Sequence, residues 1–194
     1  MIHYYVIDLE TTGLRSGYHE VTQVSIIRGS DRHQLNKYIK AEHVNRASPK
    51  ALEVTGRTYA DLSNGEDKEP VVKFCNKFLD EDGTDPEHLC MIGHNAHRFD
   101  KKFAHALWES VGMEFPAHLW LDTLPSTKAF AVKNGIYSAS FNLENCMRIV
   151  GVKPRAGMHN AVSDTQNTYI LWQKLEKGGV DMLPYTKRLP HKTG

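Results

Sequence analysis

Residues 3–9 have the sequence HYYVIDL, which predicts a β-strand and limits the folds open to this chain. β-Branched and aromatic residues follow one another there, without the polar alternation of a strand that faces water on one side. A strand of this kind is buried on both faces. It belongs inside a sheet that is covered from both sides.

The rest of the chain places strands first and helices later. Further strands are expected at residues 21–28 and 32–40, joined by a hairpin at 29–31, and shorter ones at 89–93 and 119–121. Helices are expected from Pro70 at a first helical position through Leu79, and at residues 99–111, 123–133, 141–150 and 160–177. The crossover into residues 89–93 indicates an α/β fold, a mixed sheet flanked by helices.

Size and composition favour one globular domain. The chain has 194 residues, of which 40% are hydrophobic and 24% charged, and this excludes a disordered tail, a collagen-like fibre and a coiled coil. Without repeats or a linker that could divide it, the domain is expected over residues 1–180. Residues 181–194 are expected to form a loose C-terminal tail.

Charge and cysteine content limit the ligands and the cellular compartment expected for this chain. The formal net charge is +1, so a polyanionic ligand would have to be bound by local groups or by metal. No apolar run approaches the ~20 residues that cross a bilayer, and the N-terminus lacks the pattern of a signal peptide. Cys75, Cys90 and Cys146 have no CxxC spacing and are expected to be reduced thiols of a cytoplasmic protein without a membrane partner.

Asp8 and Glu10 lie two residues apart at the end of the first strand. Side chains alternate along a strand, so both carboxylates point to the same side while Leu9 packs opposite. Two like charges at the end of an apolar strand repel each other unless a cation neutralises them. The alternative is that the strand ends in solvent and both acids are hydrated.

Two more acids fall on inward helical faces. Asp164 shares the +3, +4 spacing of Ala161, Thr168 and Leu171. Asp100 is in register with Phe103 and Leu107, and both of these stripes are mostly apolar. A buried carboxylate needs a charged partner. Lys and Arg could serve, but a metal cluster explains all four acids at once, and Mg²⁺ and Mn²⁺ prefer such ligands.

His159 lies five residues before Asp164. That offset is about 140° around a helix, so the two would not share a helical face. His159 fits better in the loop that leads into the helix. From that loop its side chain could lie over the same site. The alternative is a histidine at a helix start that makes a backbone hydrogen bond.

Three motifs in order resemble one family. Residues 8–13 (DLETTG), 93–100 (GHNAHRFD) and 159–164 (HNAVSD) are similar to the three motifs of the DEDDh 3′→5′ exonucleases, relatives of ribonuclease T, the polymerase III proofreading subunit and the TREX enzymes. Residues 121–123 (LDT) match the family's usual Asp-Thr. Residues 51–57 (ALEVTGR) resemble its hxGIT segment, with Arg57 where Ile is usual.

The resemblance implies a ribonuclease-H-like fold, with a five-stranded mixed sheet and helices on both faces. It also implies a hydrolase that removes 5′-nucleoside monophosphates from the 3′ ends of single-stranded DNA or RNA, with two Mg²⁺ or Mn²⁺ ions. The ligands carried over are Asp8, Glu10, Asp100 and Asp164. His159 is carried over as the general base.

Substrate contacts are expected from the same loops. Thr11 belongs to a segment that offers backbone N–H groups, and Leu14 offers an apolar surface to a terminal base. His94, Asn95 and Phe99 lie near the second motif, where they would contact sugar or base.

The sequence leaves three functions open. The first is a stand-alone exonuclease, and the second is a proofreading subunit with a polymerase partner. The third is a catalytically idle scaffold, which the intact acids and His159 argue against. The preference for DNA or RNA, and a homodimeric state, are also open.

Overall fold

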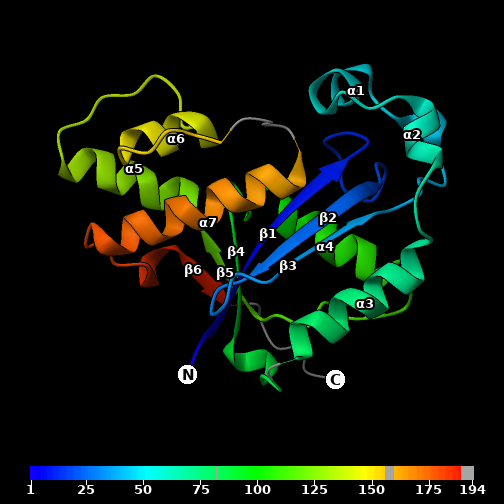
Figure 1. Ribbon diagram of the computed structural model, residues 1–194, viewed down its shortest axis with the longest axis horizontal. Helices are drawn as coiled ribbons and strands as arrows, with labels where there is room; N and C mark the ends of the chain where they lie inside the picture. The colour runs from blue at the N-terminus through cyan, green and yellow to red at the C-terminus, as the bar shows by residue number, and fades with distance from the viewer. Residues whose placement is uncertain (82, 156–159, 189–194) are drawn as a thin grey trace.

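The computed structural model describes residues 1–81, 83–155 and 160–188 and shows a six-stranded mixed sheet between layers of helices (Figure 1). The strands are β1 (His3–Thr11), β2 (Val21–Arg28), β3 (Gln34–Tyr38), β4 (Leu89–Gly93), β5 (Leu119–Asp122) and β6 (Thr186–Arg188). Their order across the sheet is β3-β2-β1-β4-β5-β6. β1 runs antiparallel to β2 and parallel to β4, so the expected α/β class is confirmed.

The helices lie on both faces of this sheet. They are α1 (Pro49–Thr55), α2 (Tyr59–Ser63), α3 (Lys68–Asp80), α4 (Asp100–Glu109), α5 (Thr123–Lys133), α6 (Leu143–Ile149) and α7 (Ala161–Lys177). Short 3₁₀ turns occupy Val44–Arg46, Pro86–His88 and Leu183–Tyr185. α7 packs on β1 and β2 with α5 and α6 beside it, while α3 and α4 cover the opposite face (Figure 1).

Burial along β1 shows which side chains face which layer. Tyr5, Ile7 and Leu9 belong to the apolar cluster that includes Phe103 and Trp108 of α4. Val6 belongs to the other cluster, with Tyr169 and Trp172 of α7. Because side chains alternate along a strand, Asp8 and Glu10 continue the Val6 side and face the α7 layer.

Most expected boundaries agree with the structure, and one helix start does not. α3 begins at Lys68, with Asp67 as its N-cap, so Pro70 is the third helical residue and not the first. A proline is tolerated there because the first N–H groups of a helix have no partner within it.

The C-terminal segment corrects another expectation. Residues 181–194 were expected to be a loose tail, and the sheet to have five strands, but β6 pairs antiparallel with β5 through Leu119 and Arg188. β6 covers what would otherwise be an open sheet edge. Its three polar residues are too few for a strand pattern to show. Residues 189–194 lie outside the described part of the chain.

Within the described ranges, none of the helices combines the length and apolar character that crossing a membrane requires. Cys75, Cys90 and Cys146 are all buried as free thiols.

Candidate active site

Three acidic side chains converge at the carboxyl end of β1. Asp8 and Glu10 come from this strand and Asp164 from the first turn of α7, and one carboxylate oxygen of each lies within 4.8 Å of the other two. Asp164 is only 9% exposed, so its inward placement is confirmed. The same-side placement of Asp8 and Glu10 is confirmed as well.

The N-terminal end of α7 fixes the position of Asp164. The side chain of Asn160 caps the helix by accepting a 2.9 Å hydrogen bond from the Val162 backbone N–H. Further along, Tyr169 and Trp172 bury the helix against the sheet. A capped and packed helix holds the Asp164 carboxylate against β1.

Asp100 brings a fourth carboxylate to β1 from the other layer. It is the first residue of α4, is 3% exposed, and its Oδ1 accepts a 3.2 Å hydrogen bond from the Leu9 backbone N–H. Gly93, seven residues before Asp100, makes room for Ala96 of the same motif, because a Cβ at Gly93 would lie 2.7 Å from the Cβ of Ala96, whereas its 3.6 Å distance to Oδ2 of Asp100 would be an ordinary contact. The second motif thus needs a glycine for close packing.

Ionisation of these acids is unfavourable in their buried positions, and their pKa values are raised. Burial raises the pKa of Asp8 well above its ordinary value, and the charges of Asp100, Asp164 and Glu10 raise it further. Burial raises the pKa of Asp100 to about 8, although the N–H groups of Asp100 and Leu9 oppose this. Burial and Asp164 raise the pKa of Glu10 to about 7, with Arg57 opposing.

This donor set fits divalent cations. Ionising four neighbouring carboxyl groups away from water is costly unless positive charge is bound among them. Carboxylate oxygens are the ligands that Mg²⁺ and Mn²⁺ prefer. Asp8, Glu10 and Asp164 present oxygens close enough to share an ion, and Asp100 lies next to them on the Leu9 amide.

His159, the expected general base, lies outside the described residues, which omit 156–159. Its role stays a prediction.

The expected substrate residues differ in how they are held. Leu14 is 85% exposed, whereas the Thr11 hydroxyl donates a 2.7 Å hydrogen bond to the Gly13 carbonyl. Both ring nitrogens of His94 have partners at 3.0 Å, the Thr123 hydroxyl and the Phe141 carbonyl. Burial lowers the pKa of His94.

The other two expected substrate residues, Asn95 and Phe99, lie in the turn that precedes α4. Phe99 packs on Phe103 with ring centroids 4.8 Å apart, and Asn95 adopts a left-handed backbone with φ 62°. Of the five expected contacts, Leu14 is therefore the side chain most open to a ligand. Contact with substrate stays a prediction for all five.

Asp122, which the sequence showed only as part of a motif match, positions a neighbouring loop. Its buried carboxylate accepts hydrogen bonds from the backbone N–H groups of Asn95, His97 and Leu124 at 2.9, 3.1 and 3.0 Å. It thereby ties the end of β5 to the loop between β4 and α4. In the sequence, the signal for this role was the position of Asp122 at the carboxyl end of a strand.

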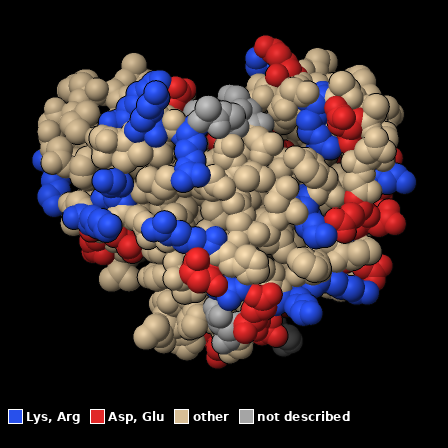
Figure 2. Space-filling model, in the orientation of Figure 1, with Lys and Arg blue, Asp and Glu red and all other residues tan. Residues whose placement is uncertain are grey.

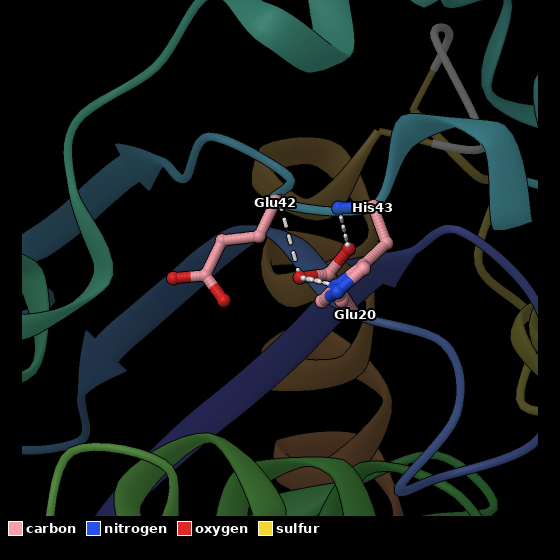
Figure 3. Close-up of side chains that lie close together, drawn as sticks. All are labelled: Glu20, Glu42 and His43. Carbon is pink, nitrogen blue, oxygen red and sulfur yellow. Dashed lines mark hydrogen bonds and ion pairs between the residues drawn. The ribbon is translucent and has the colours of Figure 1, made fainter.

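A second acidic cluster has a structural explanation. Glu20 accepts hydrogen bonds from the backbone N–H groups of Glu42 and His43 at 3.1 and 2.8 Å, and the His43 ring lies 3.5 Å from it (Figure 3). Lys68 pairs with Glu42 at 3.0 Å. Glu20 therefore fastens the chain after β3 to the start of β2, and we assign no metal to this cluster.

A cavity of about 310 Å³ adjoins the carboxylates, with Glu10 and Arg57 in its lining. Figure 2 shows the outline of the molecule indented between the part formed by α5 and α6 and the part formed by α1 and α2. Lys and Arg are interspersed with Asp and Glu over this face, as the near-neutral charge predicts. Attraction for a polyanion must therefore come from local groups.

Carboxylates gathered at one strand end of a ribonuclease-H-like mixed sheet are the arrangement expected of an exonuclease domain. The sequence profile of the exonuclease family (RNase_T) matches residues 5–172, and the chain belongs to this family, as its motifs predicted. No curated protein matched the sequence significantly.

Solved structures share the fold. A zinc-bound E. coli exonuclease I–ssDNA complex superposes with a TM-score of 0.77 at 18% identity, covering 95% of this chain and 42% of that one. Exonuclease I bound to a 5cy-dT13 oligonucleotide gives 0.75 at 18% identity and 91% and 41% coverage. A 3′-exonuclease that recognises a histone mRNA stem-loop gives 0.72 at 12% identity, covering 99% of this chain and 72% of that one. The chain thus spans about two fifths of the length of the exonuclease I chains.

Proposed function

We propose that this protein is a metal-dependent 3′→5′ exonuclease that hydrolyses phosphodiester bonds at the 3′ ends of single-stranded DNA or RNA. The observation that carries the proposal is the convergence of Asp8, Glu10 and Asp164 within 4.8 Å at the end of β1. A binding protein has no use for buried carboxylates that repel one another. The structural neighbours support the substrate class, since they include exonuclease I bound to single-stranded DNA and a 3′-exonuclease with 3′-end-specific recognition of a histone mRNA stem-loop.

Asp8, Glu10, Asp100 and Asp164 are proposed to hold two Mg²⁺ or Mn²⁺ ions. Bound there, the ions supply positive charge for the scissile phosphate and lower the pKa of the attacking water. The carboxylates orient this charge because a strand, two helix starts and the Leu9 amide fix their positions. Preorganised charge of this kind needs no rearrangement during the reaction.

His159 is proposed to accept the proton of the attacking water. A histidine suits this step because its ordinary pKa of ~6.5 leaves it neutral at physiological pH and able to take up a proton. The P–O bond to the 3′ oxygen of the penultimate nucleotide then breaks. The products are a 5′-nucleoside monophosphate and a strand shorter by one nucleotide with a new 3′-OH.

Direction and metal dependence can be tested together. Oligonucleotides labelled at the 5′ end should yield a ladder of products shortened one nucleotide at a time, with Mg²⁺ or Mn²⁺ and not with EDTA. A circular single strand should remain intact. Cutting of the circle would indicate an endonuclease and contradict the proposal.

The same assay separates the remaining alternatives. Matched DNA and RNA strands, single and double, decide the substrate. Trimming of free oligonucleotides at low enzyme concentration favours a stand-alone enzyme, and copurification with a large polymerase favours a proofreading subunit. Light scattering decides between monomer and homodimer. We propose a cytoplasmic location because all three thiols are free.

A further inference from the structure

The cavity beside Glu10 contains an arginine at a position where the family's hxGIT segment usually has isoleucine. Gly56 ends α1 in the left-handed conformation with φ 67°, and this turn directs the chain so that Arg57 lines the cavity. Isoleucine would offer only apolar surface there. Arg57 offers a charged, planar group with five N–H donors.

The Arg57 guanidinium is held in place by the protein. It donates to the Thr22 carbonyl at 3.1 Å and to the Asp61 carbonyl at 2.8 Å. It also lies 5.2 Å from the ring centroid of Tyr38. These bonds use two of the five donors. The other three have no partner among the described residues and belong to a group that is already immobilised, so a ligand would lose little entropy in binding them.

The lining of the cavity suits a neutral ligand better than a second phosphate. Among the described residues around it, Arg57 is the one cation, while Glu10 and Asp61 are carboxylates. The remaining polar side chains are neutral: those of Gln23, Tyr38, Thr55, Asn64 and Asn160. Glu10 is a proposed metal ligand, so the charges left in the lining are those of Arg57 and Asp61, which balance. A site with balanced charge and several neutral polar side chains favours the edge of a nucleobase over an anion.

The size of the cavity limits what part of a nucleic acid can enter. A volume of about 310 Å³ is at the small end of ligand pockets and takes one nucleotide, not a continuing strand. Because the cavity adjoins Glu10, a nucleotide inside it lies next to the carboxylates where the terminal bond is cut. This placement rests on the proposed exonuclease function.

We propose that Arg57 binds the base of the 3′-terminal nucleotide and makes the enzyme prefer guanine over adenine at that position. Guanine presents two adjacent acceptors, N7 and O6, which arginine binds in pairs, whereas adenine replaces O6 with an amino donor. An arginine facing adenine would set two donors against each other. Two purines of nearly the same shape are thus distinguished by one atom pair.

The test uses oligonucleotides that differ only in the last nucleotide and measures the rate of the first cleavage in a single turnover with Mg²⁺. We expect guanine to be removed at least about fivefold faster than adenine. Hypoxanthine, which keeps N7 and O6, should behave like guanine, and 7-deazaguanine should be slower. Binding of the same strands in EDTA, followed by fluorescence anisotropy, should show the same order.

Variants assign the preference to Arg57. Arg57→Met should bring the guanine-to-adenine ratio to about one, and Arg57→Lys, which keeps the charge without the planar fork, should give an intermediate ratio. Arg46→Met is the matched control, because Arg46 also lies 5.2 Å from a tyrosine ring, that of Tyr18, but does not line this cavity. Its ratio should equal that of the wild type.

The outcomes separate the two proposals. If no strand is shortened, the exonuclease function itself is wrong. If strands are shortened and the wild type removes guanine and adenine equally fast, or Arg57→Met keeps the preference, the role of Arg57 is wrong. Should Arg57→Met fail to fold, the 7-deazaguanine series on the wild type decides, and equal rates for guanine and 7-deazaguanine would overturn the inference.

Discussion

The backbone N–H of Leu9 donates a 3.2 Å hydrogen bond to the carboxylate of Asp100. Leu9 stands between Asp8 and Glu10 on β1, and Asp100 begins α4. One hydrogen bond therefore joins the two acids of the first motif to the acid of the second. The distance between these acids depends on how α4 packs against β1. A substitution that shifts α4 will therefore change the spacing of the carboxylates.

Asp8→Asn should abolish activity and leave the fold intact. Loss of a proposed metal ligand removes several kcal/mol of transition-state stabilisation, so the rate should fall by at least about 10³. In EDTA the variant should melt at a higher temperature than the wild type, because a neutral amide relieves repulsion with Glu10, Asp100 and Asp164. Single-turnover assays and thermal melts check both results. Full Mg²⁺-dependent activity would contradict the metal assignment.

The stability of the metal-free protein should depend on pH in a defined direction. The pKa values of Glu10, about 7, and Asp100, about 8, lie above the ~4 expected for the unfolded chain. Between these limits the folded state binds more protons than the unfolded state. The free energy of unfolding in EDTA should therefore fall as pH rises from about 5 to 8.5.

Divalent metal should reverse this trend, because it binds the ionised carboxylates. Urea denaturation at pH 5.5 and 8 with EDTA or Mg²⁺ measures both effects, and the stabilisation by Mg²⁺ should be larger at pH 8. Asp8→Asn is the control and should show a smaller response to metal. Equal stabilisation at the two pH values would argue against carboxylates with raised pKa values as the ligands.

His159→Ala should lower kcat by about 10²–10⁴ with folding and metal binding retained, because positioned proton transfer contributes that much. Part of the rate should return at high pH, where hydroxide replaces the missing base. The wild-type rate should decline as pH falls through ~6.5. His43→Ala is a control, since His43 pairs with Glu20 outside the carboxylate site. An unchanged kcat beside a lower melting temperature would assign His159 to the helix start instead.

Asp122→Ala should destabilise the protein by about 2–4 kcal/mol. The buried carboxylate accepts three backbone hydrogen bonds, and its removal leaves those N–H groups without their acceptor. Urea denaturation gives the free energy of unfolding. Ser126→Ala is a comparison at the same end of β5, since its hydroxyl donates a single 2.8 Å bond to the Asp122 carbonyl, and the smaller loss is expected there. A loss below about 1 kcal/mol for Asp122→Ala would show that the loop does not depend on this carboxylate.

Backbone periodicity was enough to predict the local geometry of the site. Strand alternation put Asp8 and Glu10 on the side opposite Leu9, and helical periodicity turned Asp164 inward, because both patterns depend only on backbone repeat and on which residues avoid water. The motif order also led to the family. These inferences need no knowledge of how distant segments meet.

Contacts between distant segments could not be predicted in this way. The sequence shows neither that the Leu9 amide is bonded to Asp100 nor that both ring nitrogens of His94 are already bonded. β6 is held by contacts with distant segments, namely its pairing with β5 and the ion pair of Arg188 with Glu87, so its three polar residues carried no signal of their own. Arg57 was visible as a departure from a motif, but the cavity around it is formed by residues of β1, β2, β3, α1 and α2 and by the residue that caps α7. Contacts between distant segments arise from packing, and packing is a property of the folded chain as a whole.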